Sequence, residues 1–557
     1  MAKNSNFTWS QKPMLYHSRS KFDLSHHHKT MFNEGQLIPF YVQEVYPGDT
    51  FKCKSTNVIR TTVPFLRPVM DNLFLDMFYF FVPNRLTYDK WQEVMGENKT
   101  SYWAPETYAE VPTASTESNG IGTIADYMGV PVTLSNKYQN VSTLPFRAYA
   151  LIWNEWFRDQ NTQQPVLIDT GDEGDYILNT SVWSVNNIYG MPAPINKLHD
   201  YFTSCLPAPQ KGSSVDLPFT GSVPVYATSS QNPNPGVGNF QNLTFVNQDW
   251  SKLANGYYNS VVFANSVDSF MGFGANTTSP ISPNPTLSGV TPSNLQAIFN
   301  NSDLGLTVND LRLAFQTQKL LEKDARGGTR YTEYLQEHFG VLSPDSRLQR
   351  PEFLGGKRMP LQLQQVAQTS SSVEDSPLAQ VSAFSLSNGT CGFSKGFVEH
   401  GFIIGVMAVR QFHTYQQGIE RFWFRRKRLD FYDPVFSNIG EQPVYTKELY
   451  AYDIDLDSEQ IFGYNEAWAD LRYRPSRVSG KLRSYGNSGF DIWHFADNYS
   501  NVPILNDTFM RETNIYLNRT LSVDSSVAPN FVIDIFNKIE AIRPLPTYSV
   551  PGLIDHH

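Results

Sequence analysis

The sequence predicts an all-β protein, a jelly roll or β-sandwich whose first and last strands meet, with long inserted loops that contain several helices. Residues 73–82 and 402–409 are almost unbroken apolar and aromatic runs, which indicates fully buried strands. Residues 531–542 alternate between small or branched apolar side chains and charged ones, as a half-buried strand does. Strands are therefore expected near both ends of the chain, with long insertions between them.

Further strands are expected on both sides of these runs. Residues 37–45 and 51–63 have strand composition, and Pro47-Gly48-Asp49 between them is a turn signal. Residues 489–495 are expected to form another strand, and residues 84–95 a short helix.

Three longer helices are predicted within the insertions. Aromatic residues recur at helical spacing over 144–161, and Pro145 suits the first helical turn. The broad aromatic face of this helix favours packing in a core over a ligand pocket. Residues 307–326 begin with a capping-box pattern and end at a glycine pair, and residues 329–339 form the third helix.

The composition favours a protein that buries its surface in an assembly. Of 557 residues, 14% are aromatic and 17% are charged, against about 25% charged in ordinary soluble domains. The net charge of −9 excludes a bulk nucleic-acid condenser, although local basic patches remain possible. Three scattered cysteines without zinc or disulfide spacing suit a reducing compartment. The first residues lack an apolar signal core, so the chain is expected to stay in the cytoplasm, without membrane insertion.

Two segments differ in amino-acid composition from the predicted strands. Residues 1–35 are polar and are expected to form an N-terminal arm, and the run His26-His27-His28 within it is a weak candidate for a metal site. Residues 211–305 are rich in Ser, Asn, Gly, Pro and Thr and almost lack basic residues, which favours a long exposed loop. This loop contains interspersed aromatic residues that are candidates for contact with another molecule: Trp250, Tyr257, Tyr258, Phe263, Phe270 and Phe273.

The strongest electrostatic features are two clusters in which basic and aromatic residues interleave. The basic members are Arg421, Arg425, Arg426, Lys427 and Arg428 in the first cluster, and Arg472, Arg474, Arg477, Lys481 and Arg483 in the second. Such clusters suit single-stranded nucleic acid, because basic side chains bind phosphates and aromatic rings stack on bases. Salt bridges between subunits, made with the excess carboxylates, explain them equally well. Both interpretations stay open.

The sequence carries no recognised catalytic or phosphate-binding motif. Asp453, Asp455 and Asp457 alternate in an acidic stretch, which a solvated strand face or a cation site in an assembly explains better than acid–base catalysis. A jelly-roll enzyme or a lectin-like carbohydrate-binding protein is the alternative to a structural role. A cupin-type enzyme needs closely spaced metal ligands, and His400 and His413 lack that spacing. No cofactor or metal is expected.

Several long segments carry a family resemblance. They are PGDTFK (47–52), MDNLFLDMFYFFVPNRL (70–86), RAYALIWNEWFRDQN (147–161), SPDSRLQRPEFLGG (343–356), PVFSNIGEQPVYTKELY (434–450), EAWADLRYRPSRVSG (466–480) and PTYSVPGLIDHH (546–557). Together they resemble the major capsid protein of the Microviridae, the small icosahedral single-stranded DNA bacteriophages, and most closely its gokushovirus branch. They cover nearly the whole chain outside 211–305.

This resemblance implies an eight-stranded antiparallel viral jelly-roll β-barrel spanning residues 36–557. It implies a homo-oligomeric T=1 icosahedral shell around a circular single-stranded DNA genome, present in the virion and assembled in the bacterial host cytoplasm. It also implies a small basic DNA-binding viral protein as internal partner, which agrees with the negative net charge. In gokushovirus capsids a variable loop forms protrusions at the threefold axes, proposed to meet a host surface receptor, and residues 211–305 are the expected equivalent.

Overall fold

The computed structural model divides the chain into two compact units, residues 1–211 with 322–557 and residues 212–321. The smaller unit contains two short antiparallel ribbons, β9 (Val225–Ala227) with β12 (Leu295–Ala297) and β10 (Phe245–Asn247) with β11 (Val290–Pro292). The structure describes residues 18–97, 109–116, 120–132, 138–172, 176–177, 183–186, 190–215, 225–227, 245–247, 290–292, 295–297, 308–370, 378–437, 439–452, 458–486 and 489–548.

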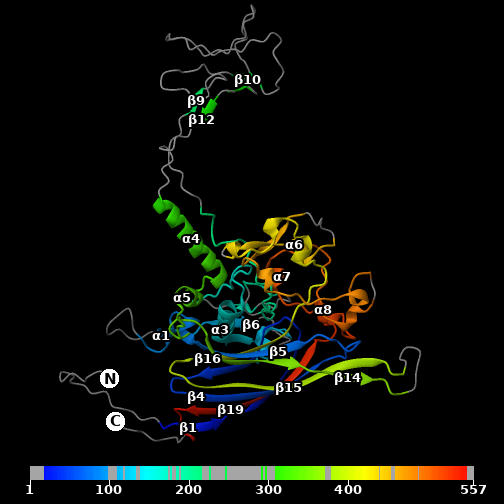
Figure 1. The fold of residues 1–557 in the computed structure, drawn as a ribbon. Coiled ribbons are helices and arrows are strands. Elements are labelled where there is room, and N and C mark those ends of the chain that lie inside the picture. Colours follow the sequence, from blue (N-terminus) through cyan, green and yellow to red (C-terminus); the bar gives the residue numbers. More distant parts are fainter. Residues whose placement is uncertain are drawn as a thin grey trace, which may run out of the picture. The chain divides into compact units, whose positions relative to one another are not determined.

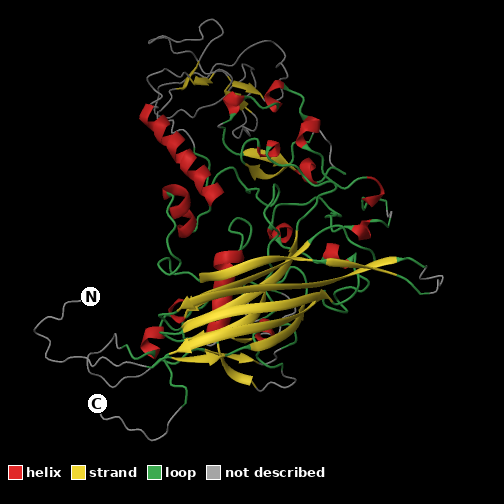
Figure 2. Cartoon of the chain, turned by 60° about the horizontal axis from the view of Figure 1, so that its bottom comes forward, coloured by secondary structure: helices red, strands yellow, loops and turns green. Residues whose placement is uncertain are grey.

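Two antiparallel sheets dominate the larger unit (Figures 1 and 2). The six-stranded sheet has the order β1-β19-β4-β15-β14, and β2 also pairs with β19. Its strands are β1 (Ser20–Asp23), β2 (His26–Phe32), β4 (Thr50–Thr61), β14 (Leu363–Ala367), β15 (Val381–Gly396) and β19 (Phe531–Arg543). The four-stranded sheet has the order β13-β5-β16-β3, formed by β3 (Ile38–Val45), β5 (Leu73–Pro83), β13 (Glu352–Leu361) and β16 (Gly401–Gln411).

The expected all-β antiparallel architecture is confirmed, but a closed barrel is not observed. The two main sheets are separate and open, and they bury their apolar faces against each other, so that packing rather than strand pairing joins them. The first and last strands meet as predicted, because β1 and β2 both pair with β19. Residues 20–23 and 26–32 of the expected N-terminal arm are therefore sheet strands.

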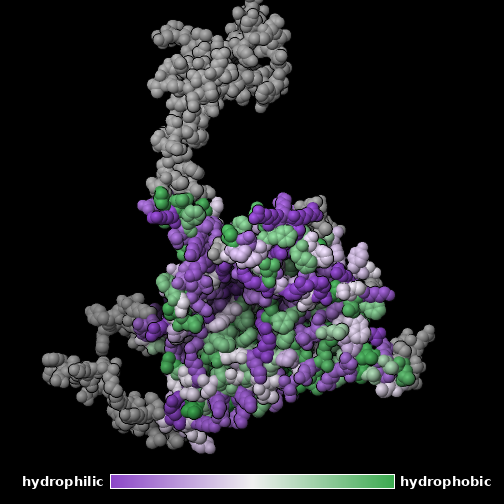
Figure 3. Space-filling model, viewed as in Figure 1, coloured by the Kyte–Doolittle hydropathy of each residue, from purple (hydrophilic) through white to green (hydrophobic). Residues whose placement is uncertain are grey.

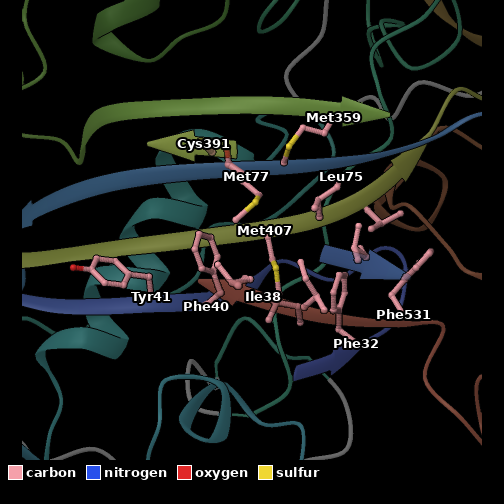
Figure 4. Close-up of a cluster of buried hydrophobic side chains, with 14 of the residues drawn as sticks. Phe32, Ile38, Phe40, Tyr41, Leu75, Met77, Met359, Cys391, Met407 and Phe531 are labelled. Carbon is pink, nitrogen blue, oxygen red and sulfur yellow. Dashed lines mark hydrogen bonds between the residues drawn. The ribbon is translucent and has the colours of Figure 1, made fainter. Parts of the chain in front are cut away.

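The main core fills the space between the two sheets. Strict alternation along β4 buries every second residue, among them Phe51, Cys53 and Ile59. Figure 4 shows Met77 of β5 and Met407 of β16 pointing toward this core. The predictions of buried strands at 73–82 and 402–409 and of a half-buried strand at 531–542 are confirmed within one or two residues at each end.

A second core lies on the other face of the four-stranded sheet. There α3 (Leu144–Ile152), extended by one π-helical turn (Trp153–Phe157), packs its aromatic residues against β5 and β16. The Tyr149 hydroxyl donates to the Leu37 carbonyl oxygen over 2.6 Å. Core packing of this predicted helix is confirmed.

The remaining described elements are short, apart from α4 (Val308–Gly327) and α5 (Tyr331–Phe339), which match the predicted helices. They are α1 (Trp91–Val94), α2 (Ile124–Tyr127), α6 (Thr446–Leu449), α7 (Asp507–Met510), α8 (Ile515–Asn518), β6 (Thr113–Thr116), β7 (Tyr138–Ser142), β8 (Tyr176–Ile177), β17 (Gln442–Tyr445) and β18 (Ile461–Asn465). No helix in the described ranges is long and apolar enough to cross a membrane.

Two local predictions need correction. The prediction of a strand at 489–495 is wrong. The centre of this segment is a 3₁₀ turn, Asp491–Trp493. The Phe495 amide donates to the Asp71 carboxylate over 2.6 Å rather than to a neighbouring strand. The helix expected at 84–95 is split into a 3₁₀ turn and α1.

Candidate nucleic-acid and assembly interface

The two basic–aromatic clusters of the sequence lie together around one cavity of about 590 Å³, here called the basic cleft. The first cluster begins with the 3₁₀ turn Arg421–Phe424, and the second begins directly after the 3₁₀ turn Ala469–Leu471. The charged residues that line the cleft are six arginines and three carboxylates: Arg421, Arg425, Arg472, Arg474, Arg477, Arg483, Glu420, Glu448 and Asp470. The cleft therefore has an excess of positive charge.

Carboxylates of the same chain already bind most of these arginines. Glu420 contacts both Arg474, at 3.5 Å, and Arg477. Asp470 binds Arg425 and Glu466 binds Arg472, while Glu448 lies 3.7 Å from Arg421. The salt bridges that the sequence suggested between subunits are thus made, for these residues, within one chain.

The cleft has a buried inner part and an exposed rim. The side chains of Arg421 and Arg425 are only 16% and 10% exposed. Burial raises the pKa of Glu448 above its usual value, although Arg421 and the Tyr201 hydroxyl, which donates to Glu448 over 2.9 Å, act in the opposite direction. Arg421 and Arg425 consequently hold the loops in place.

The rim offers the groups that an external ligand can reach. The Arg474 and Arg477 side chains are 74% and 55% exposed, so their ion pairs with Glu420 face solvent. Phe422 and Trp423 are also exposed, with ring centroids 5.0 Å apart. Charged forks beside exposed rings can bind phosphate and stack on a base.

The rest of the first cluster lies around a second cavity of about 360 Å³, which shares Arg421 and Arg425 with the basic cleft. Arg426 and Lys427 line it, and the Lys447 ammonium lies 4.3 Å from the centre of the Phe424 ring. Arg428 is exposed and lines neither cavity. The structure therefore brings the two predicted clusters together except at Arg428 and at Lys481 of the second cluster, which line neither cavity.

Of the other residues singled out from the sequence, several lie outside the described residues, and the histidine run that is described does not form a site. The six aromatic residues expected to contact a receptor, like Asp453, Asp455 and Asp457, lie outside the described residues. The His26-His27-His28 run occupies β2, where His27 lies 3.2 Å from Asp534 and His26 stacks on Tyr41. These three histidines do not converge, and no group of potential metal ligands is found in the described ranges.

Sequence reasoning missed a buried ionic cluster. The His413 ring lies between carboxylates, 2.7 Å from Asp497 and 3.0 Å from Glu512, and the Lys197 ammonium lies 3.1 Å from Asp497. Burial alone would lower the pKa of His413, but the two carboxylates outweigh it and raise the pKa to about 10. The four residues come from distant parts of the sequence, so no local pattern could have indicated them.

Comparison with known proteins decides between the structural and the enzymatic interpretations. Residues 10–553 match the family described as Capsid protein (F protein). The chain belongs to this capsid protein family. Three relatives are each described as Capsid protein VP1, from Bdellovibrio phage phiMH2K, Chlamydia phage 1 and Spiroplasma virus 4. Their identities to this capsid protein are 37%, 38% and 39%, over 99%, 98% and 96% of its length and 98%, 97% and 95% of theirs.

The match confirms the resemblance to gokushovirus major capsid proteins. It makes this chain a major capsid protein, a structural component of a multimeric shell in the virion rather than an enzyme. The alternative of a jelly-roll enzyme or lectin is thereby set aside.

Proposed function

We propose that this capsid protein is an eight-stranded viral jelly roll that assembles into a T=1 icosahedral shell around a circular single-stranded DNA genome. The observation that carries the proposal is the full-length match to capsid proteins VP1 of three phages. The strand pairing supports the fold, the surface supports the assembly, and the charge distribution supports the presence of nucleic acid.

A jelly roll is an antiparallel ribbon of eight strands wrapped into two sheets, so the first strand pairs with the eighth and so on inward. The strands β2, β3, β4, β5, β13, β15, β16 and β19 follow this rule. Four pairs have the expected order: β2 with β19, β3 with β16, β4 with β15, and β5 with β13. The two sheets form where β19 meets β4 and where β16 meets β5. On this interpretation β1 and β14 are additions at the sheet edges.

Assembly would cover apolar surface that a single chain exposes. Large apolar side chains that are at least 70% exposed include Met70, Leu342, Val398, Leu429 and Val435. A closed shell repeats the same heterologous contacts around its symmetry axes and removes such surface from water. The low charged fraction of 17% fits this arrangement.

The net charge of the chain supports a genome that is neutralised by another protein. With a net charge of −9, this chain leaves DNA phosphates uncompensated, so a small basic viral protein inside the shell is the expected counterpart. The basic cleft is the candidate contact predicted from the sequence, either with DNA or with a neighbouring subunit. Assembly takes place in the host cytoplasm, before release of the virion.

The insertion at 211–305 is the proposed host-attachment element. It is polar and almost lacks basic residues, which suits solvent better than a surface that faces a genome. Clustering around a threefold axis would let its aromatic residues pack against copies of themselves. Rings left exposed would be anchors for a bacterial surface receptor.

Sedimentation of the purified chain, under conditions in which infectious particles are intact, tests the proposal. A closed particle of one size that protects single-stranded DNA from nuclease is the expected result. A chain that remains monomeric under those conditions, or a shell that encloses duplex DNA, would refute the proposal.

A further inference from the structure

The outward face of the six-stranded sheet has a charge pattern unlike that of the basic cleft. Alternation leaves Lys52, Lys54 and Arg60 of β4 exposed on this face. The strand register places Lys538 of β19 on the same face, directly opposite Lys54. Figure 3 shows hydrophilic residues gathered along the lower margin of the molecule, where Figure 1 places β4 and β19.

This face has more cations than carboxylates. Its charged side chains on β1, β2, β4 and β19 are Lys21, Lys29, Lys52, Lys54, Arg60 and Lys538 against Asp23, Asp534 and Glu540. Lys21 binds Glu540 at 3.1 Å, and Asp534 is shared by His27 and Lys29. Within the described part of the chain, Lys52, Lys54, Arg60 and Lys538 form no direct ion pair, in contrast to the paired arginines of the cleft. Glu540 nevertheless attracts Lys52 and Lys538, and Asp23 attracts Lys538.

The opposition of Lys54 and Lys538 is unfavourable in the isolated chain. Side chains directly opposite each other on antiparallel strands have Cβ atoms about 5 Å apart, and like charges there repel. A bound anion placed over the pair would turn this repulsion into attraction. Exposed aromatic surface lies nearby, because Phe536, two residues before Lys538 on the same face, is 37% exposed.

We propose that this sheet face binds the backbone of single-stranded nucleic acid, with Lys54 and Lys538 as a paired phosphate contact and Lys52 and Arg60 extending it along β4. Lys52 lies two residues, or about 6.7 Å, from Lys54 on this face. Arg60 lies six residues, or about 20 Å, from Lys54, beyond the uncharged Thr56 and Val58. Phe536 supplies a ring on which a base can stack. The inference rests on the proposed enclosure of a single-stranded genome and names the surface that meets it.

The sheet face and the basic cleft lie on opposite sides of the sandwich. The cleft is lined by Glu448 of α6, and α6 lies beyond the four-stranded sheet, away from β4 and β19 (Figure 1). A closed shell has one interior, so both surfaces cannot line it. The unpaired cations favour the sheet face as the inner one, and the cleft is then free for contacts between subunits.

The test measures how binding of a labelled oligo(dT) to the full-length chain depends on salt. The variant replaces Lys54 and Lys538 with Gln. The control replaces Lys319 and Lys357, two exposed lysines outside this face, with Gln. It therefore changes the net charge by the same amount as the variant. Each phosphate contact on a single strand contributes about 0.7 to the slope of log affinity against log salt. The Lys54→Gln, Lys538→Gln variant should therefore lose about 1.4 from the slope, and the control should bind as the wild type does.

Other outcomes would overturn the inference. If the variant keeps the wild-type slope, or if Arg474→Gln with Arg477→Gln lowers the slope instead, the sheet face is not the nucleic-acid surface. If the variant binds DNA normally but no longer assembles, the face contacts an acidic surface of another subunit. If the wild-type chain itself binds no oligo(dT), the proposed genome enclosure fails as well. The melting temperatures of the variant and the wild type are compared as a control. If that of the variant is no lower, misfolding does not explain a smaller slope of log affinity against log salt.

Discussion

The carboxylate of Asp76 accepts two hydrogen bonds from the guanidinium of Arg358, at 2.7 and 3.0 Å. Arg358 lies directly opposite Asp76 on the neighbouring strand β13, and Arg410 of β16 donates to the same carboxylate over 2.8 Å. Asp76 is completely buried and is the only charged residue in the apolar run 73–82. Its role is to join three strands of the four-stranded sheet through one carboxylate.

Replacing Asp76 with Ala should strongly destabilise the fold. The substitution leaves two guanidiniums without a counter-charge next to a core, and removing one partner of a buried pair costs about 3–5 kcal/mol. Denaturant unfolding of the unassembled chain measures the loss. Glu459→Ala, which removes an exposed carboxylate, should change the free energy of unfolding by less than about 0.5 kcal/mol. A loss below about 1 kcal/mol for Asp76→Ala would contradict the assigned role.

Stability should fall as the pH rises above neutrality, because of the buried ionic cluster. The pKa of His413 is about 10 in the folded chain against its usual 6.5. Its contribution is therefore fully present below pH 6.5 and is lost as the pH rises toward 10. Burial, reinforced by the Glu512 carboxylate, raises the pKa of Glu34 above its usual 4.5, which acts in the same direction from pH 4.5 upward.

The pH dependence can be assigned by substitution. We expect the free energy of unfolding of the wild-type chain to decline between pH 6.5 and 10, and His413→Gln to flatten that decline while lowering stability at neutral pH. A series of denaturant titrations across this range provides the measurement. Parallel curves for the two proteins would show that another group causes the decline.

Lys538→Glu should separate stability from nucleic-acid binding. A carboxylate at this position would face Lys54 across the strands, and an opposite-charge pair there contributes roughly 0.2–1 kcal/mol. The same substitution also removes the attraction of Lys538 to the Asp23 and Glu540 carboxylates, so the two effects on stability oppose each other. The variant should therefore bind oligo(dT) more weakly while its unfolding in denaturant changes little. Lys357→Glu controls for the change in net charge. Unchanged binding would argue that the lysine pair has no role in DNA contact.

Shortening residues 231–285 to a brief Gly-Ser bridge tests the insertion. Loop closure changes by only about 0.6 kcal/mol per doubling of length, so the sandwich should fold normally. We expect shells that assemble but no longer adsorb to the host, measured by depletion of particles from suspension. Normal adsorption would remove the receptor role, and failure to assemble would make the insertion an assembly element.

The strands could be predicted because burial imposes a simple period on the sequence. The apolar runs and the alternation at 531–542 locate β5, β16 and β19 within one or two residues. At 489–495 the same composition misled, because the centre of the segment is a 3₁₀ turn. Phe495 is buried in the main core, whereas Phe490 is exposed. Apolar composition alone therefore does not identify a strand.

The candidate sites could be predicted only in part. The two basic clusters were visible as local patterns, but most of the acids that neutralise them, such as Glu420 for Arg474 and Arg477, come from other segments. Lys54 and Lys538 lie at opposite ends of the chain, and only the pairing of β4 with β19 places them together. Charge opposition between distant strands depends on register, which the sequence of one strand does not determine.

Electron cryomicroscopy of purified particles shows directly whether the chain forms a closed shell around nucleic acid. We expect a closed T=1 shell of jelly rolls, with the face of Lys54 and Lys538 turned inward against nucleic-acid density and the 211–305 insertion projecting outward. Particles whose six-stranded sheet faces solvent, or preparations without closed particles under conditions that preserve infectivity, would contradict it.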